Sequence, residues 1–457
     1  MAKSKDPNGE PPRGSLKARA LGAGGWSIFN VLVGFGFRLV SNLIMTRLLV
    51  PEAFGVMAMA TVVLSALELF TDIGISRSIM REKDGDDPHF LRVAWVVRIL
   101  RSAVIAIGLF IMALAVWILA PSLATEGSVY AAPELPGLLM LVALSPILDG
   151  LASTSRELTM RRMENRRFAM IVLSSRLMSL AAMAGFALIY PTVWALMVGM
   201  LTAKLISSTM THVFLPGPRM AFEWDREIAA RLWTFGRWIL ASSALTFFAR
   251  SIDKLILAGL LSSTLFGLFV IAQIWIEAGR GIINRLSTTV GFPAMAEVIR
   301  TRPKDVPRLY RKFQSVIDLA CFSAFVATEL LGQHLINFLY TDDYSLAGRY
   351  LQLMAPSFLV IRFLTIGNLI MNTGDSRSSF IISSFRAAGA LFGVPLGYSM
   401  MGTEGAILGA VLAPMFAVPY ILLRVRSILT TRQVLFDTAW AVMTLILTAI
   451  VFWNVNT

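Results

Sequence analysis

The chain has 457 residues, of which 56% are apolar and only 15% are charged, and its formal net charge is +13. Soluble domains carry about a quarter of charged residues, so this composition excludes an ordinary soluble protein. Apolar runs long enough to cross a hydrocarbon core of about 30 Å recur along the whole chain. Lys and Arg fall in the short loops between these runs, where they orient helices. The sequence therefore predicts an all-α polytopic membrane protein with no nucleic-acid partner.

Motifs of enzyme chemistry are missing from the sequence. The single cysteine, Cys321, lies in an apolar run, and His89, His212 and His334 lack the spacing of metal ligands. The chain has no G-x-x-x-x-G-K-[ST] loop for nucleotide phosphates and no Ser-His-Asp or Cys-His arrangement. We therefore expect no enzymatic activity, no cofactor and no metal.

The apolar runs predict thirteen spans separated by short connections. The expected spans are 24–49, 53–75, 93–119, 135–155, 168–189, 192–214, 232–259, 264–291, 312–338, 347–371, 378–400, 404–423 and 434–454. The chain then divides into a polar cytoplasmic tail (1–22), a six-helix bundle (23–215), a cytoplasmic linker (216–231), a second six-helix bundle (232–427) and an additional C-terminal span (428–457). No loop is long enough to hold a soluble domain.

Basic residues occupy alternate loops only. The loops around 77–92, 156–167, 219–226, 300–312, 377 and 424–432 hold Lys and Arg, whereas the intervening loops near 51, 120–134, 191, 262–263, 340–346 and 401–404 hold none. Positive loops face the cytoplasm. We expect the N-terminus to be cytoplasmic and, with thirteen spans, the C-terminus to lie outside.

The two bundles carry traces of an internal repeat. Residues 38–60, RLVSNLIMTRLLVPEAFGVMAMA, align without a gap to residues 250–272, RSIDKLILAGLLSSTLFGLFVIA. The informative pairs are Arg38 with Arg250, Phe54 with Phe266 and Gly55 with Gly267; a weaker match pairs Pro146 with Pro356 and Arg176 with Arg386. Six spans separate the copies, so both have the same orientation. The repeat predicts two pseudo-symmetric six-helix bundles around a central cavity.

Three segments carry a family resemblance: TRLLVPEAFGVMAMA (46–60), ELFTDIGISRSIMRE (68–82) and TTVGFPAMAEV (288–298). With them the chain resembles the Wzx-type polysaccharide flippases of the multidrug/oligosaccharidyl-lipid/polysaccharide (MOP) superfamily. The resemblance implies a MATE-like fold in the bacterial inner membrane and alternating-access transport of an undecaprenyl-diphosphate-linked oligosaccharide. Polysaccharide polymerase and export machinery are implied partners, besides membrane lipid. Twelve spans are usual in this family, so the thirteenth is a departure.

Charged residues within the expected spans are the candidate site. The cationic candidates for lining the cavity are Arg38, Lys204, Arg250, Arg362, Arg176 and Arg386. Such an excess of positive charge suits a diphosphate, because Arg pairs with phosphate oxygens through a planar, two-pronged set of donors. Asp253, Lys254, Glu277 and Asp72 are candidates for ion coupling or for balancing that charge.

Several interpretations stay open at this point. An isolated Arg in a span can extend to the interface or pair with a carboxylate, as Arg250 could with Asp253. The fold also suits an ion-coupled exporter of cationic drugs, although such a site should be rich in acids and aromatics. A membrane oligosaccharide polymerase or ligase is a third hypothesis, against which the short loops argue.

Overall fold

The computed structural model describes residues 33–162, 164–372, 376–426 and 429–456. The first half comprises a first helix (Val33–Thr46), α2 (Pro51–Phe70), α3 (Ile75–Arg81), α4 (Pro88–Leu123), α5 (Glu134–Val142), α6 (Leu144–Gly150), α7 (Ser155–Arg161), α8 (Asn165–Ile189) and α9 (Val193–Phe214). The second comprises α10 (Arg226–Leu260), α11 (Ser263–Leu286), α12 (Phe292–Thr301), α13 (Val306–Leu339), α14 (Ser345–Met354), α15 (Ser357–Asn372), α16 (Ser376–Leu412) and α17 (Val418–Val425). A final helix, α18 (Thr431–Asn456), follows.

Twelve of the thirteen expected spans overlap one or more of these helices. The remaining one, 24–49, is described only from residue 33 onward, where it overlaps the first helix, and the expected polar tail (1–22) lies outside the described residues. Eight helices within the described residues are long and apolar enough to cross a membrane, or nine when the bent pair 134–150 and 155–161 is counted as one span. The segment α10 is absent from that set although it is 35 residues long. Its charged residues, Arg250 and Asp253 among them, lower its hydropathy.

The long helix α16 contains two of the expected spans. Its backbone leaves the helical region at Met401 and Gly402, and Gly402 has a φ of +62°, which L side chains rarely adopt. The two arms of this hairpin pack closely: an added Cβ at Gly397 would lie 2.1 Å from the carbonyl oxygen of Gly405. The predicted break at 401–404 is therefore a tight turn between adjacent spans.

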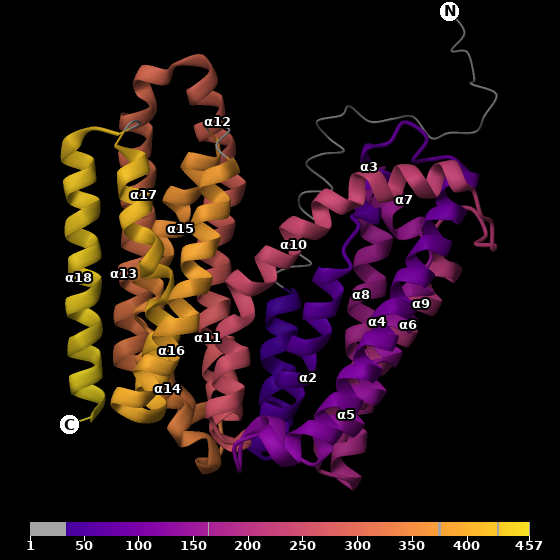
Figure 1. Cartoon of the computed structure of the whole chain (residues 1–457), viewed down its shortest axis with the longest axis horizontal. Coiled ribbons are helices and arrows are strands. Elements are labelled where there is room, and N and C mark those ends of the chain that lie inside the picture. Colours follow the sequence, from indigo (N-terminus) through magenta and orange to yellow (C-terminus); the bar gives the residue numbers. More distant parts are fainter. Residues whose placement is uncertain (1–32, 163, 373–375, 427–428, 457) are drawn as a thin grey trace, which may run out of the picture.

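The two halves meet at one end of the molecule, which we call the closed end. An ideal Cβ at Gly55 of α2 would lie 2.9 Å from the backbone nitrogen of Gly267 of α11. Ser128 and Ser262 form an isolated antiparallel bridge at the same end. The Tyr344 hydroxyl donates a hydrogen bond of 2.6 Å to the carbonyl oxygen of Leu49. Figure 1 shows α2 and α11, which carry Gly55 and Gly267, side by side in the lower part of the view.

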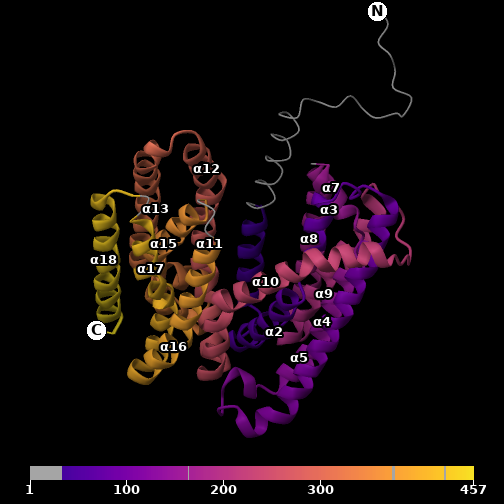
Figure 2. The ribbon, with the colours of Figure 1, turned by 45° about the horizontal axis from the view of Figure 1, so that its top comes forward.

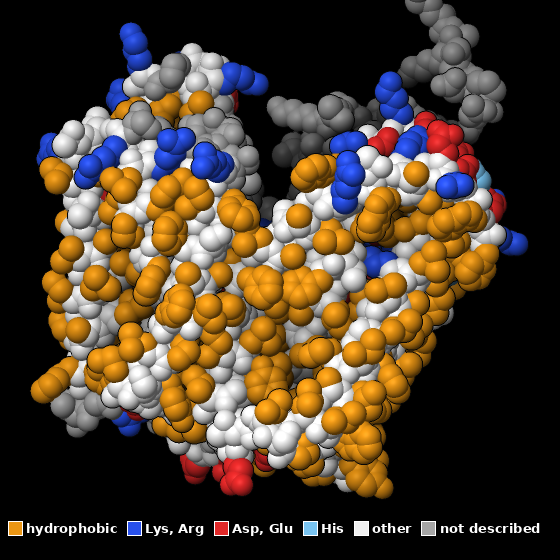
Figure 3. Space-filling view, in the orientation of Figure 1, with side chains coloured by type: hydrophobic (Ala, Val, Ile, Leu, Met, Phe, Trp, Pro, Cys, Tyr) orange, Lys and Arg blue, Asp and Glu red, His pale blue; other side chains and the backbone are white. Residues whose placement is uncertain are grey.

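Toward the other end the halves diverge, as Figures 1 and 2 both show. One large hydrophobic core joins the halves near the closed end, whereas two separate clusters lie beyond it, one around Phe90 and Leu232 and one around Tyr310 and Ile421. Lys and Arg side chains gather at this diverging end and Asp and Glu at the closed end (Figure 3), although acidic side chains also lie beside the first half's basic loops. We call the diverging end the basic end.

The helix α10 crosses from one half to the other (Figure 1). Its first turns pack on the first half: Ile228 and Leu232 join the cluster of Phe90, and an added Cβ at Gly236 would lie 2.5 Å from the Ile73 Cβ. Farther along, α10 packs against α16 of the second half. The expected boundary at 231/232 therefore falls inside this helix.

Candidate functional site

In the first half, two of the predicted arginines lie on neighbouring helices. Arg38 lies on the first helix and is exposed. One turn earlier, Gly34 faces α8, and a Cβ added there would lie 2.4 Å from Nη1 of Arg176. Gly34 and Arg38 are four residues apart and share a helix face. The missing side chain of Gly34 thus makes room for the Arg176 guanidinium beside the turn that carries Arg38.

The first helix also contacts the second half. An added Cβ at Gly281 of α11 would lie 2.9 Å from the ring of Phe35. One turn beyond Arg38, Asn42 Oδ1 accepts a hydrogen bond of 2.8 Å from the Tyr340 hydroxyl, which itself accepts one from Trp275. Arg38 therefore lies between contacts to the second half on one side and the contact with Arg176 on the other.

In the second half, the repeat counterparts of these arginines are also brought together. Arg386 of α16 lies close enough to Arg250 of α10, to Arg280 of α11 and to Asp253 for their charges to interact. The Nε of Arg386 and the Nε of Arg280 are buried and without a hydrogen-bond partner among the described residues. Three guanidinium groups from three helices thus share one region, with Arg280 adjacent to the Gly281 that touches the first helix.

Arg280 was missed by the sequence analysis. It lies toward the end of its span, where a basic residue is ordinarily interfacial, and no counterpart in the first repeat copy marks it. A detectable signal was the i, i+3 spacing from Glu277: Arg280 Nη1 lies 3.4 Å from Glu277 Oε1. Because Glu277 is the only carboxylate within 4 Å of Arg280 among the described residues, Arg280 keeps donors for a further acceptor.

Asp253 and Arg280 line a small cavity inside the second half, together with Gln273, Ser357 and other residues of α11, α15 and α16. Its volume is about 50 Å³, enough for a water molecule or two. Neither Arg250 nor Asp253 forms an ion pair within 4 Å among the described residues. Lys254 and Glu277 lie near enough to Asp253 to interact with its charge.

Lys204 has a partner in the first half. Its Nζ lies 3.0 Å from Asp149 Oδ1, joining α9 to α6, and both side chains are part-exposed. Glu68 of α2 interacts electrostatically with this pair and with Arg101. Lys204 therefore already has a carboxylate partner, whereas Arg38 forms no ion pair within the part of the chain that the structure describes.

Asp72 forms the turn between α2 and α3. Its Oδ1 accepts a hydrogen bond of 2.9 Å from the Gly74 backbone nitrogen, and its Oδ2 accepts one of 3.2 Å from the Ser243 hydroxyl of α10. Gly74 has a φ of +64°, and a Cβ there would lie 2.2 Å from the Ile239 side chain. These contacts explain why Asp72 and Gly74 occur together in the segment 68–82: both residues pack the turn against α10.

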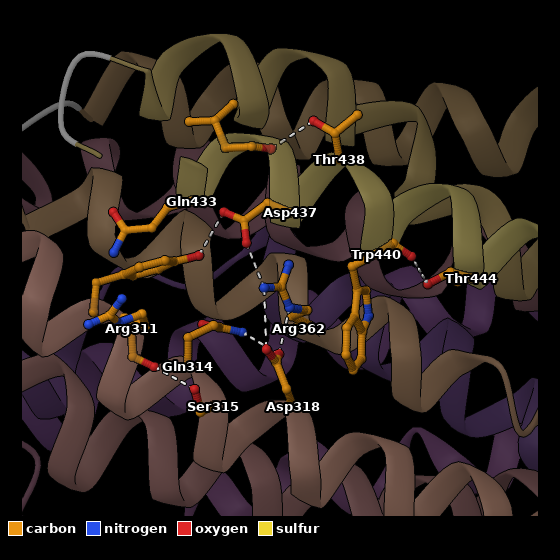
Figure 4. A network of polar contacts seen from close by, with 12 residues as sticks. Arg311, Gln314, Ser315, Asp318, Arg362, Gln433, Asp437, Thr438, Trp440 and Thr444 are labelled. Carbon is orange, nitrogen blue, oxygen red and sulfur yellow. Dashed lines mark hydrogen bonds and ion pairs between the residues drawn. The ribbon is translucent and has the colours of Figure 1, made fainter. Parts of the chain in front are cut away.

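Arg362 of α15 lies apart from the other predicted arginines, and its side chain lies between Asp318 of α13 and Asp437 of α18 (Figure 4). Its side chain is completely buried, with Nε 2.5 Å from Asp318 Oδ1 and Nη2 2.6 Å from Asp437 Oδ1. Tyr310 and Gln314 donate further hydrogen bonds to these carboxylates. A guanidinium held by two carboxylates inside one half has no direct access to a ligand between the halves, so we leave it out of the proposed diphosphate site.

The chain is similar to known proteins of polysaccharide biosynthesis. A model of the polysaccharide biosynthesis protein family matches residues 44–347, two thirds of the chain. The chain belongs to this family. Its expected resemblance to the Wzx-type flippases of the MOP superfamily is confirmed. The lipopolysaccharide biosynthesis protein WzxC of Escherichia coli (strain K12) is 21% identical over 404 residues, 87% of this chain and 79% of that protein.

A second relative and two solved structures are also similar to this polysaccharide biosynthesis protein. The succinoglycan biosynthesis transport protein ExoT of Rhizobium meliloti (strain 1021) is 24% identical over 281 residues, 61% of this chain and 54% of that protein. Among solved structures, the lipid II flippase MurJ in an inward closed conformation has a TM-score of 0.66 at 13% identity, covering 94% of this chain and 98% of MurJ. An inward-facing multidrug resistance MATE transporter has a TM-score of 0.64 at 15% identity, covering 85% and 94%. The predicted MATE-like fold is confirmed.

Proposed function

We propose that this protein flips an undecaprenyl-diphosphate-linked oligosaccharide across the bacterial inner membrane during polysaccharide assembly. The observation that carries the proposal is the arrangement of Arg38 with Arg176 in one half and of Arg250 with Arg386 in the other, at matching positions of the repeat. The names of the family and of WzxC concern polysaccharide biosynthesis, and the name of ExoT adds transport, which supports the proposal.

The diphosphate is the part of such a cargo that arginines would hold. It carries its negative charge at the junction between lipid and sugar, whatever the sugar is. Arg guanidinium groups offer paired donors to phosphate oxygens and stay charged in a poorly hydrated space. We propose Arg38, Arg250, Arg280 and Arg386 as the contacts, with Arg176 placing its charge beside Arg38.

The proposed transport cycle uses the contrast between the two ends. Lys and Arg loops face the cytoplasm, so the basic end, where the halves diverge, is the proposed entry side. Release on the other side requires the halves to separate at the closed end. The hydrogen bond from Tyr344 to Leu49 and the contact of Gly55 with Gly267 would then be lost.

Asp253 is the proposed coupling or charge-balancing group. It shares a cavity with Arg280, and Lys254 and Glu277 act on its charge. A cation or proton there would alter the field that Arg250, Arg280 and Arg386 present to an anion. Glu277, which pairs with Arg280, is the second candidate for this role.

Export of cationic drugs is the second candidate function, because a multidrug transporter shares the fold. A cationic drug would meet Arg250, Arg280 and Arg386 together, and like charges repel strongly at short distance. The excess of arginine therefore favours an anionic cargo. For the third hypothesis, a polymerase or ligase, we find no supporting arrangement in the described residues.

Purified protein in liposomes tests the proposal. A fluorescent undecaprenyl-diphosphate oligosaccharide is placed in both leaflets, and an impermeant reductant destroys the accessible dye. We expect all of the dye to be destroyed in liposomes with the protein, about half without it, and half with Arg250→Gln. Ethidium efflux is measured in parallel. Efflux of ethidium without lipid flipping would replace our proposal with the drug exporter.

A further inference from the structure

A second cavity, distinct from the region between the halves, opens where α13 and α18 begin. Its volume is about 480 Å³, and its lining includes Arg308 and Arg311 of α13, Arg432 of α18, and the buried Arg362, Asp318 and Asp437. Four arginines face two aspartates, which leaves two positive charges on the lining. We refer to it as the α13–α18 pocket.

The surplus charge lies at the mouth of the pocket. On its floor, Arg362 is held by Asp318 and Asp437. Arg308, Arg311 and Arg432 are exposed, and none of them lies within 4 Å of a carboxylate among the described residues. The mouth therefore presents three arginines that an external anion can engage. The first turns of α13 and α18 meet there too, and their backbone N–H groups add a partial positive charge.

The surroundings of the pocket point to a lipid. Phe436 forms part of the lining and is 55% exposed, and Leu435 beside it is 65% exposed. On the facing helix, Val316 and Leu319 are also exposed. Cationic groups thus lie at the basic end, directly beside exposed apolar side chains of two helices that are long and apolar enough to cross a membrane. A phospholipid has the same order of groups, with an anionic phosphate next to apolar acyl chains.

The pocket also joins α18 to the rest of the molecule. The Tyr310 hydroxyl donates a hydrogen bond of 2.9 Å to Asp437 Oδ2, and Gln433 Nε2 donates one of 2.5 Å to the Pro307 carbonyl oxygen. Figure 1 places α18 at the outer edge of the second half, away from the junction of α2 with α11. A ligand here would hold α18, which is the thirteenth expected span, against α13 without entering the space between the halves.

We infer that the α13–α18 pocket binds the phosphate headgroup of an anionic glycerophospholipid from the leaflet at the basic end. Basic pockets between membrane helices on the cytoplasmic side bind such headgroups. The pocket's volume of about 480 Å³ suits a phosphate headgroup with its glycerol, and the pocket lies apart from the junction of the halves, where we propose that the cargo binds. Bulk lipid, rather than the transported cargo, is therefore the proposed occupant.

Native mass spectrometry of the purified full chain tests this inference. Phosphatidylglycerol, phosphatidylcholine and undecaprenyl phosphate are titrated separately. We expect phosphatidylglycerol to bind best. The variant Arg308→Gln, Arg311→Gln, Arg432→Gln should bind it about a hundredfold more weakly, because each of the three arginines near an anionic lipid contributes about a factor of five. The matched control, Arg300→Gln, Arg302→Gln, Lys304→Gln, removes three exposed charges at the same end and should bind normally.

A pocket-filling variant distinguishes binding inside the pocket from attraction to the surface charge of its arginines. Ser315→Trp places a large side chain in the pocket and keeps all its arginines; we expect it to lose phosphatidylglycerol too. Normal binding by this variant, equal binding of phosphatidylcholine, or equal weakening in the matched control would each overturn the inference. Preferential binding of undecaprenyl phosphate would overturn the choice of lipid. Arg250→Gln should retain phosphatidylglycerol, so failure of the transport proposal would leave this result unaffected.

Discussion

Gly55 and Gly267, which occupy the same position in the two repeat copies, touch each other where the halves meet. A Cβ on Gly55 would lie 2.2 Å from the Ser263 carbonyl oxygen, and one on Gly267 would lie 1.9 Å from the Pro51 carbonyl oxygen. Small residues let membrane helices approach at backbone distance. The pseudo-symmetry axis therefore passes through a contact between two backbones.

This contact gives the first prediction. Gly267→Ala should destabilise the closed end, because backbone atoms cannot rotate away as a side chain could, and overpacking costs about 1–3 kcal/mol. We expect a cysteine placed at the buried Leu49, in a Cys321→Ser background, to react faster with an impermeant maleimide when Gly267→Ala is present. Gly185→Ala is the control, since nothing lies within 4 Å of its Cβ. Equal labelling in both would mean that the helices adjust without opening.

The repeat was visible in the sequence because its geometry needs particular residues. Gly55 and Gly267 permit a close approach, so their positions are restricted in both copies. Arg38 and Arg250 kept the same register because both lie on helices along the junction. The sequence could not show that Gly34 makes room for Arg176, since that contact depends on the packing of α8 on the first helix.

The partners of individual charged side chains could not be predicted from the sequence. Arg362 was grouped with the other arginines because its depth in a span was the only available criterion. Its partners, Asp318 and Asp437, come from helices 44 and 75 residues away in sequence. Distances of that kind depend on tertiary packing, and no local pattern encodes them. For the same reason Arg280 was overlooked and Asp72 was treated as a coupling candidate.

Arg280 provides the second prediction. Arg280→Ala should reduce lipid flipping to a small fraction of the wild-type rate at normal membrane abundance, because it removes one of the three neighbouring guanidinium groups of Arg250, Arg280 and Arg386. Arg280→Lys should restore it in part, since an ammonium cannot reproduce the planar pair of donors. Arg47→Ala, which removes an exposed charge at the closed-end side of the first helix, should transport normally. Full activity of Arg280→Ala would remove this residue from the proposed site.

Arg362 should behave in the opposite way. Arg362→Leu leaves Asp318 and Asp437 buried without their cation, and breaking a buried ion pair from one side costs about 3–5 kcal/mol. We expect less folded protein and a lower melting temperature, while the transport rate per folded molecule stays near normal. Its guanidinium also lies 5.0 Å from the Trp440 ring, so tryptophan fluorescence offers an independent readout of the disturbed packing. A stable protein with lost transport would instead place Arg362 in the mechanism.

The linker before α10 supplies a prediction about pH. Glu223 lies in this linker and is hydrogen-bonded to His89 at 2.8 Å and also to Arg92, both of α4. These bonds hold the pKa of Glu223 below its usual value, with the bond to His89 the main cause. The contribution of the Glu223 charge is therefore complete above the ordinary carboxylate pKa and is lost as the pH falls through the lowered one. The same contact raises the pKa of His89, so the contribution of the His89 charge is lost as the pH rises through that raised value.

Hydrogen exchange measures that loss. Corrected for its intrinsic rate, exchange in residues 216–225 of the wild type should be slowest between the two pKa values. It should rise as the pH falls below the ordinary carboxylate range and also as the pH rises through the raised pKa of His89. In Glu223→Gln it should already be faster at neutral pH. Glu297→Gln, an exposed change on α12, is the control. Protection of the linker that is identical in wild type and Glu223→Gln would show that these contacts do not hold it.

The last prediction concerns Arg250 and Asp253, which lie within one turn of α10. If they formed a structural pair, Asp253→Asn would strand a buried charge, and the double variant Arg250→Gln, Asp253→Asn would recover both abundance and transport. The structure shows no ion pair within 4 Å for either residue among those described, and it places Arg250 near Arg386 and Asp253 near Lys254 and Arg280.

We therefore expect Asp253→Asn to be present in the membrane at normal abundance, and the double variant to be abundant but inactive. Arg250 is exposed, so water can solvate it when Asp253 is neutral. Transport instead fails because the diphosphate loses one of its proposed contacts. The deciding measurement is lipid flipping per folded molecule in the double variant, with Arg47→Gln as the charge-matched control for removal of one arginine. Wild-type flipping by the double variant would show that Arg250 acts only as the partner of Asp253.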